Sequence, residues 1–127
     1  MSFNLNDDLR TARLQVLADA MSGGTLTLYD APRPAIGAAI TTQTALIEVE
    51  IPSGLTASAA TLVLSLSMSA VLVEGEAVWG RITSSTDAFV ADGDCGLLAS
   101  DKIFKLKTTY LAAGANLIPI IASFSEP

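Results

Sequence analysis

The sequence contains no histidine and a single cysteine, and each shortage excludes a common kind of chemistry. Without histidine, a serine or cysteine nucleophile has no imidazole base, and the usual zinc sites lose a frequent ligand. A single cysteine cannot form an intrachain disulfide. Because Cys95 has no histidine partner, we expect it to be a small, partly buried residue in a turn rather than a nucleophile.

Charged and aromatic residues are also scarce, at 16% and 6% of the 127 residues. Seven basic and thirteen acidic side chains give a net charge of −6 without a basic cluster, which argues against nucleic acid as the main partner. The most apolar stretch, 59–73, is interrupted by hydroxyl side chains and is shorter than a membrane-spanning helix. Residues 1–8 are polar and acidic, unlike a signal peptide, so we expect a chain made in the cytoplasm with no membrane partner.

Half of the residues are nonetheless hydrophobic. A chain of this length buries about two-thirds of its unfolded surface, which is enough for one domain without disulfides or metals. With so few charges to cover the outside, part of the folded surface is expected to be apolar. Apolar surface of that kind is often contacted by another protein.

Close pairs of acidic residues are the remaining candidates for chemistry. Asp92 and Asp94 could offer oxygen ligands to a calcium ion, but they lack the spacing and closing glutamate of an EF-hand, so we favour a solvated turn. Two further pairs have a spacing of two residues, Glu48/Glu50 and Glu74/Glu76. On a strand both members of such a pair share one face, and a solvated face is favoured over a glycosidase site. We therefore predict no catalytic, cofactor-binding or metal-binding residue.

Residues 1–22 are predicted to form an N-terminal amphipathic helix. Asn6 can accept hydrogen bonds at the start of the helix, and Gly23 and Gly24 can end it. Apolar residues recur at three- and four-residue spacing and predict one apolar face, made of Leu9, Ala12, Val16, Leu17, Ala20 and Met21. We expect this face to pack against the rest of the chain or against another copy, because a short helix is marginal alone.

Residues 23–127 are predicted to form a single β-domain, because apolar and polar residues alternate in short runs separated by glycine and proline. The predicted strands are 25–29, 45–51, 61–68, 71–73, 76–83, 88–90, 103–106 and 117–124, with residues 92–96 as a turn. Trp79 could stack on a sugar, but its neighbours are typical of a core strand. Seven or eight short antiparallel strands at this spacing are typical of a β-sandwich or a jelly roll.

The run Leu117–Ile121 is the most apolar segment near the C-terminus. Because Pro119 cannot donate a ladder hydrogen bond, we place this run on an edge strand or at a bulge. An apolar edge needs a cover, and a partner chain could supply it. The candidate interface residues are therefore Leu9, Val16, Leu17, Leu117, Ile118, Ile120 and Ile121.

The order of motifs along the chain resembles that of a family of small tailed-phage virion proteins of similar length. A helix runs into the segment Gly23–Asp30, and a proline-containing break follows at 32–34. A tryptophan-containing strand at Ala77–Ile82 precedes the segment Asp92–Gly96 and a final Lys107–Ala115 segment that ends in Ala-Ala-Gly-Ala. Members of that family are capsid decoration, or cementing, proteins with a β-sandwich or jelly-roll fold.

This resemblance implies a structural protein without enzymatic activity or cofactors. Its partner would be the major capsid protein, and it would sit on the outer capsid surface of a virion as a homo-oligomer, either a dimer or a trimer. Three alternatives stay open: a tail or head–tail joining protein, a carbohydrate-binding adhesin module, and, ranked last, a hydrolase that uses aspartate and glutamate.

Overall fold

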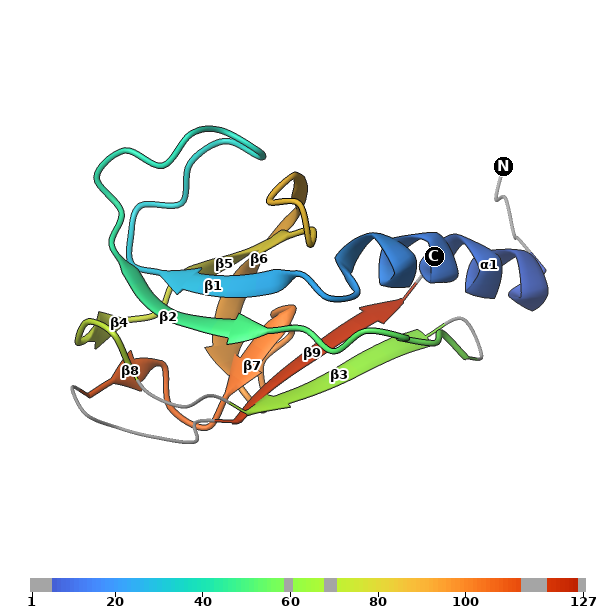
Figure 1. Cartoon of the computed structure of the whole chain (residues 1–127). Coiled ribbons are helices and arrows are strands. Elements are labelled where there is room, and N and C mark those ends of the chain that lie inside the picture. The colour runs from blue at the N-terminus through green and yellow to red at the C-terminus, as the bar shows by residue number, and fades with distance from the viewer. Residues whose placement is uncertain (1–5, 59–60, 68–70, 113–118, 126–127) are drawn as a thin grey trace, which may run out of the picture.

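The computed structural model describes residues 6–58, 61–67, 71–112 and 119–125. One helix precedes nine strands in this part of the chain (Figure 1). The elements are α1 (Asp7–Met21), β1 (Thr25–Tyr29), β2 (Ala45–Glu50), β3 (Thr61–Ser67), β4 (Gly75–Glu76), β5 (Trp79–Thr83), β6 (Phe89–Leu97), β7 (Phe104–Leu106), β8 (Tyr110–Leu111) and β9 (Pro119–Ser125). The predicted mainly β fold with one N-terminal helix is confirmed.

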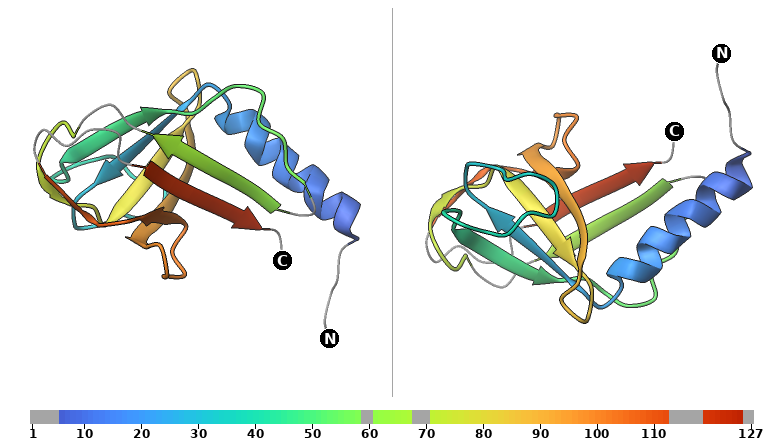
Figure 2. Two further views of the ribbon diagram at one scale, coloured as in Figure 1. Left: turned by 90° about the horizontal axis from the view of Figure 1, so that it is seen from below. Right: turned by 90° about the horizontal axis from the view of Figure 1, so that it is seen from above.

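Seven strands form one curled sheet in the order β2-β1-β5-β6-β7-β9-β3, and β4 pairs with β8 in a small second sheet. The pairs are antiparallel except β6 with β7, so the sheet is mixed where we predicted only antiparallel strands. The parallel pairing joins only three residues of each strand, beginning with Cys95 opposite Phe104. The chain therefore has to return by only a short distance between the end of β6 and the start of β7, and residues 98–103 make this connection. Helix α1 lies at one end of the curled sheet, and β4 and β8 lie at the other (Figures 1 and 2).

The ends of α1 follow the predicted signals. The Asn6 side chain accepts hydrogen bonds from the backbone N–H groups of Asp8 and Leu9, at 2.7 and 3.4 Å. After the helix, Gly23 adopts a positive φ of 73°. A Cβ on Gly24 would lie 2.0 Å from the carbonyl oxygen of Thr83, so only glycine lets the chain pass this close to the end of β5.

The buried face of α1 agrees with the predicted one only at Met21 and, in part, at Leu17. Leu14, Ala18 and Met21 pack into the core, whereas Leu9 and Val16 are 56% and 70% exposed. The helix carries two apolar stripes on nearly opposite sides, and spacing alone cannot tell which of them faces the sheet. Of the other residues in the predicted apolar face, Ala12 and Ala20 are exposed as well. Leu17 is half-buried and packs against the core.

Trp79 lies in the core with no exposed surface, as predicted, and is therefore not available to stack on a sugar. It begins β5, because the predicted single strand 76–83 is divided into β4 and β5. The predicted strand 71–73 is also absent from the sheet. Instead, the N–H groups of Leu72 and Val73 donate to the carbonyl oxygen of Leu46 on the outer edge of β2, at 2.8 and 3.3 Å.

The predicted turn 92–96 is wrong, because these residues belong to the nine-residue strand β6. Gly93 of this segment does not form a turn but leaves space for the side chain of Phe104. A Cβ on Gly93 would lie 3.0 Å from the ring of Phe104, and a Cβ on Gly80, opposite it on β5, would lie 2.8 Å from Leu28. Phe104 thereby packs flat against the sheet and is fully buried.

The predicted edge strand near the C-terminus is also wrong, because β9 lies between β7 and β3 in the interior of the sheet. Pro119 is tolerated there because it is the first residue of β9 and lies beyond the pairing with β7. Ile120 is fully buried in the chain's own core, so it cannot be an interface residue, whereas Ile121 is 36% exposed. Leu117 and Ile118 lie outside the described residues.

Replacing Leu14 with Asp should lower the free energy of unfolding by about 3 kcal/mol or more, because it buries an unpaired charge in the core. Val16→Asp is the matched control on the exposed side of the same helix and should change it by less than about 1 kcal/mol. Urea unfolding of both variants measures the difference. Equal losses would contradict the assignment of the buried face.

Candidate functional site

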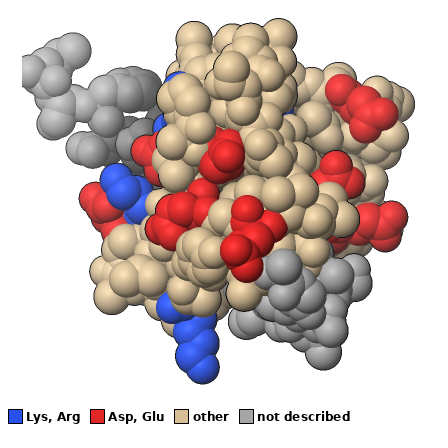
Figure 3. Space-filling model, turned by 90° about the vertical axis from the view of Figure 1, so that its left-hand side faces the viewer, with Lys and Arg blue, Asp and Glu red and all other residues tan. Residues whose placement is uncertain are grey.

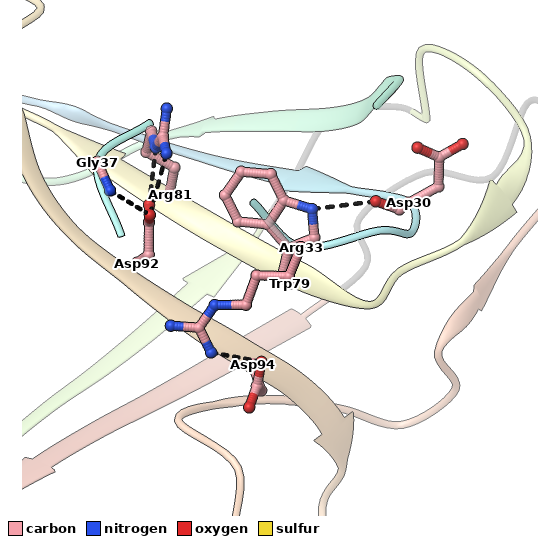
Figure 4. A network of polar contacts seen from close by, with 7 residues as sticks. All are labelled: Asp30, Arg33, Gly37, Trp79, Arg81, Asp92 and Asp94. Carbon is pink, nitrogen blue, oxygen red and sulfur yellow. Dashed lines mark hydrogen bonds and ion pairs between the residues drawn. The ribbon is translucent and has the colours of Figure 1, made fainter. Parts of the chain in front are cut away.

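The connection between β1 and β2, residues 30–44, arches over β5 and β6 and is tied to them by charged side chains (Figure 4). The guanidinium of Arg81 on β5 donates two hydrogen bonds to the carboxylate of Asp92 on β6, at 2.7 and 3.0 Å. The second Asp92 oxygen also accepts the Gly37 N–H of the loop, at 3.0 Å. Arg33 of the loop pairs with Asp94, two residues further along β6, at 2.6 Å.

The Arg81–Asp92 pair is a cross-strand pair, because the two residues lie opposite each other in the β5–β6 register. The Asp92 side chain has no exposed surface and that of Arg81 is 11% exposed. Burial alone would raise the pKa of Asp92, but the hydrogen bonds from Arg81 and Gly37 and the nearby positive charges outweigh it, so its pKa lies below the usual value. The carboxylate is therefore ionised and fully engaged at neutral pH.

The base of the loop is anchored on the core tryptophan. The Trp79 indole N–H donates to the carbonyl oxygen of Asp30 at 3.0 Å, and the Asp30 carboxylate accepts the Thr44 N–H at 2.6 Å. Tyr29 stacks on Trp79 with ring centroids 4.6 Å apart and an angle of 16°. The two ends of the loop are thus joined to each other and to β5.

The part of the loop held by these contacts has an apolar tip. Ile36 is 76% exposed and Ile40 is 37% exposed. Gly37 lies against the ring of Phe89 at the start of β6, and Phe89 itself is 44% exposed. The guanidinium of Arg81 lies 5.3 Å from the centre of the Phe89 ring, which links this ring to the Arg81–Asp92 pair. We call Ile36, Ile40 and Phe89 the loop-tip group.

Asp92 and Asp94 lie in strand β6 rather than in a turn. Asp92 is buried against Arg81 of β5, whereas Asp94 pairs with Arg33 of the loop and stays 44% exposed. In the described residues, no three potential metal-ligating side chains come together. The two remaining acidic pairs were predicted to be solvated, and all four residues are exposed: Glu48/Glu50 and Glu74/Glu76.

A shallow polar groove of about 250 Å³ borders the network, and its lining includes Arg33, Asp94, Asp101 and Lys102. Cys95 directly follows Asp94 in sequence. It lies on strand β6 rather than in a turn, and its side chain is buried in the core. Burial, together with the charge of Asp94, raises the pKa of the Cys95 thiol to about 12. The thiol is therefore protonated at neutral pH and is a poor nucleophile.

The structure distributes the candidate interface residues over separate surfaces. Leu9 and Val16 are exposed on the outer side of α1, and Ile121 is partly exposed on β9, but none of them joins the loop-tip group. Sequence reasoning missed the loop-tip group altogether. Its signal was the apolar stretch 35–40 directly after two prolines, which is unusual in a loop.

No protein-family model, curated protein or solved structure matches this chain. The described part of the chain also contains no helix long and apolar enough to span a membrane. The candidate site thus consists of a loop held by paired charges, with exposed apolar side chains at its tip.

Cys95 should resist thiol reagents as long as the chain is folded, because its pKa of about 12 leaves almost no thiolate at pH 8. Labelling by a disulfide reagent should be fast in concentrated urea and limited by unfolding in its absence. Fast stoichiometric labelling of the folded chain would contradict the buried position of the thiol.

Asp92→Asn should lower the free energy of unfolding at pH 7 by about 2 kcal/mol or more, since it leaves the Arg81 charge uncompensated. Because the pKa of Asp92 is lowered by folding, its contribution is present above the unfolded pKa of about 3.9 and is lost as the pH falls through the folded value. The difference between wild type and variant should therefore shrink below about pH 4.

Urea unfolding from pH 7 to pH 2.5 measures this dependence. Asp87→Asn is the matched control, because Asp87 is exposed and its positive φ of 64° suits asparagine. A constant difference between wild type and Asp92→Asn over the whole range would contradict the role of the carboxylate.

Proposed function

We propose that this protein is a capsid decoration protein of a tailed phage. It binds the outer face of the major capsid protein lattice and stabilises the head without catalysing a reaction. In this role the chain is made in the host cytoplasm and ends on the virion surface. The proposal combines the order of sequence motifs with the chemistry of the exposed surfaces.

The observation that carries the proposal is the presence of several separate groups of exposed apolar side chains on a fixed frame. A protein that bridges neighbouring shell subunits must contact at least two of them, so it needs more than one binding surface. The loop-tip group is one such surface, and the outer side of α1, with Leu9 and Val16, is another. These two surfaces come from different elements.

The polar contacts support the same interpretation. The buried charges of Arg81 and Asp92 hold a loop in place and are engaged with each other, whereas a catalytic site would keep a charged group available to a substrate. A fixed loop loses little conformational freedom when it binds. In this proposal the ion pair contributes to capsid binding by holding the loop in one arrangement. Association of this chain into a dimer or trimer on the capsid surface belongs to the same proposal.

Shells of the major capsid protein encoded in the same genome should assemble with normal geometry when this chain is missing, but rupture at lower temperature. Adding the purified chain should restore heat resistance, since binding to the assembled state stabilises it by about 2.7 kcal/mol per site at a concentration one hundred times the Kd. Differential scanning calorimetry of shells with and without the chain measures the effect.

The double variant Ile36→Ser/Ile40→Ser should restore less heat resistance than wild type. It keeps the buried network of the loop and removes only exposed apolar surface. Shells that are equally robust without the chain, or a chain found only in tails, would contradict the decoration role.

A further inference from the structure

The end of the molecule opposite α1 carries an exposed apolar surface that does not belong to the loop network. Leu72, Val73 and Tyr110 are 61%, 46% and 50% exposed there. Glu74 and Glu76 border them and are exposed as well. Pairing of β4 with β8 places Glu76 directly opposite Tyr110. We call these five residues the β4–β8 patch.

The backbone of the β4–β8 patch is fixed against the edge of β2. The N–H groups of Leu72 and Val73 donate to the carbonyl oxygen of Leu46, at 2.8 and 3.3 Å. A Cβ on Gly75 would lie 3.0 Å from the Leu46 side chain, so glycine lets this segment lie close against β2. The backbone of this segment therefore binds one carbonyl group on the β2 edge while the side chains of Leu72 and Val73 stay exposed.

Both carboxylates of the patch are held in place by neighbouring hydroxyl groups. The Thr109 hydroxyl donates to Glu76 at 2.5 Å. The Tyr110 hydroxyl donates to Glu74, and this hydrogen bond is the main cause of the raised pKa of Tyr110. A carboxylate has about four acceptor positions, so each retains capacity for a further donor. Exposed acidic side chains that are already fixed lose little conformational entropy when a partner binds.

Charge decides what kind of partner fits the patch. Aspartate and glutamate side chains gather on the side of the molecule that carries β4 and β8, and few basic side chains lie among them (Figure 3). A second copy of this chain, with its net charge of −6, would be repelled there. An apolar centre with a charged rim is the usual anatomy of a protein interface, and an acidic rim selects a basic one.

We propose that the β4–β8 patch binds a capsid shell subunit at an apolar site bordered by lysine and arginine. This inference rests on the proposed function and assigns one of its binding surfaces. Leu72, Val73 and the Tyr110 ring fill the apolar centre of the contact. Glu74 and Glu76 pair with the basic rim and orient the chain as it approaches.

Replacing Leu72 and Val73 with serine tests the apolar centre. The Kd for shells lacking the chain, measured by co-sedimentation, should rise at least tenfold for the double variant. The control is Val63→Ser/Leu98→Ser, which removes two exposed apolar side chains elsewhere and should stay within about twofold of wild type. Urea unfolding checks that both variants are folded. Equal binding by the two variants would overturn the proposal.

Replacing Glu74 and Glu76 with glutamine tests the acidic rim, because glutamine keeps the hydroxyl contacts and removes only charge. The association rate at low salt should fall threefold to tenfold and should depend less on salt than that of wild type. The control Glu48→Gln/Glu50→Gln removes the same charge from exposed positions on β2 and should retain most of the salt dependence. Identical behaviour of the two variants would overturn the proposal.

The two levels of the proposal fail in different ways. Wild-type protein that does not bind shells at all would overturn both the decoration role and the patch. Wild-type protein that binds, together with patch variants that bind equally well, would overturn only the patch and would leave the decoration role standing.

Discussion

The buried ion pair between Arg81 and Asp92 is the interaction on which the position of the loop 30–44 depends. It joins β5 to β6, and through the Gly37 N–H it also joins both strands to the loop over them. Arg81 lies 5.2 Å from the centre of the Trp79 ring, so the same side chain contacts the core and the loop network. A charged pair in this position is costly to bury, and its three hydrogen bonds hold the loop against β5 and β6.

The apolar frame around this pair depends on close approach between backbone and side chains. Gly80 and Gly93 leave space for the ring of Phe104, because a Cβ on either residue would lie 3.0 Å from it. Trp79 is buried beside them and anchors the base of the loop through Asp30. Apolar side chains such as Ile36, Leu72 and Val16 lie outside this core. Exposed apolar side chains of this kind are the physical basis of the proposed decoration role.

Local signals predicted the elements that depend on local chemistry. Asn6 begins the helix, Gly23 follows it, and alternation located most strands, because capping, left-handed backbone and burial on one face are encoded within a few residues. The signals failed where distant residues decide the outcome. Residues 92–96 have the composition of a turn, but they pair with β5 and β7 in the sheet, and Arg81 and Arg33 bind the carboxylates of Asp92 and Asp94.

The sequence predicted that apolar side chains would be exposed, but not which residues would form the candidate surfaces. Low charge and high hydrophobic content indicated that apolar surface would be exposed. Which residues are exposed depends on how the elements pack. Spacing could not distinguish the Val16 side of the helix from the Leu14 side, and the interior position of β9 buried Ile120. The loop-tip group and the β4–β8 patch depend on contacts between segments far apart in sequence.

The central claim is that this chain acts by occupying a repeated lattice rather than by turnover or by forming one joint. Quantitative mass spectrometry of purified particles tests it most directly, by comparing the number of copies of this chain with the number of shell subunits. The account predicts a constant ratio that follows the shell subunits, so that larger shells carry more copies. A single ring of copies whatever the shell size, or no copies at all, would contradict it.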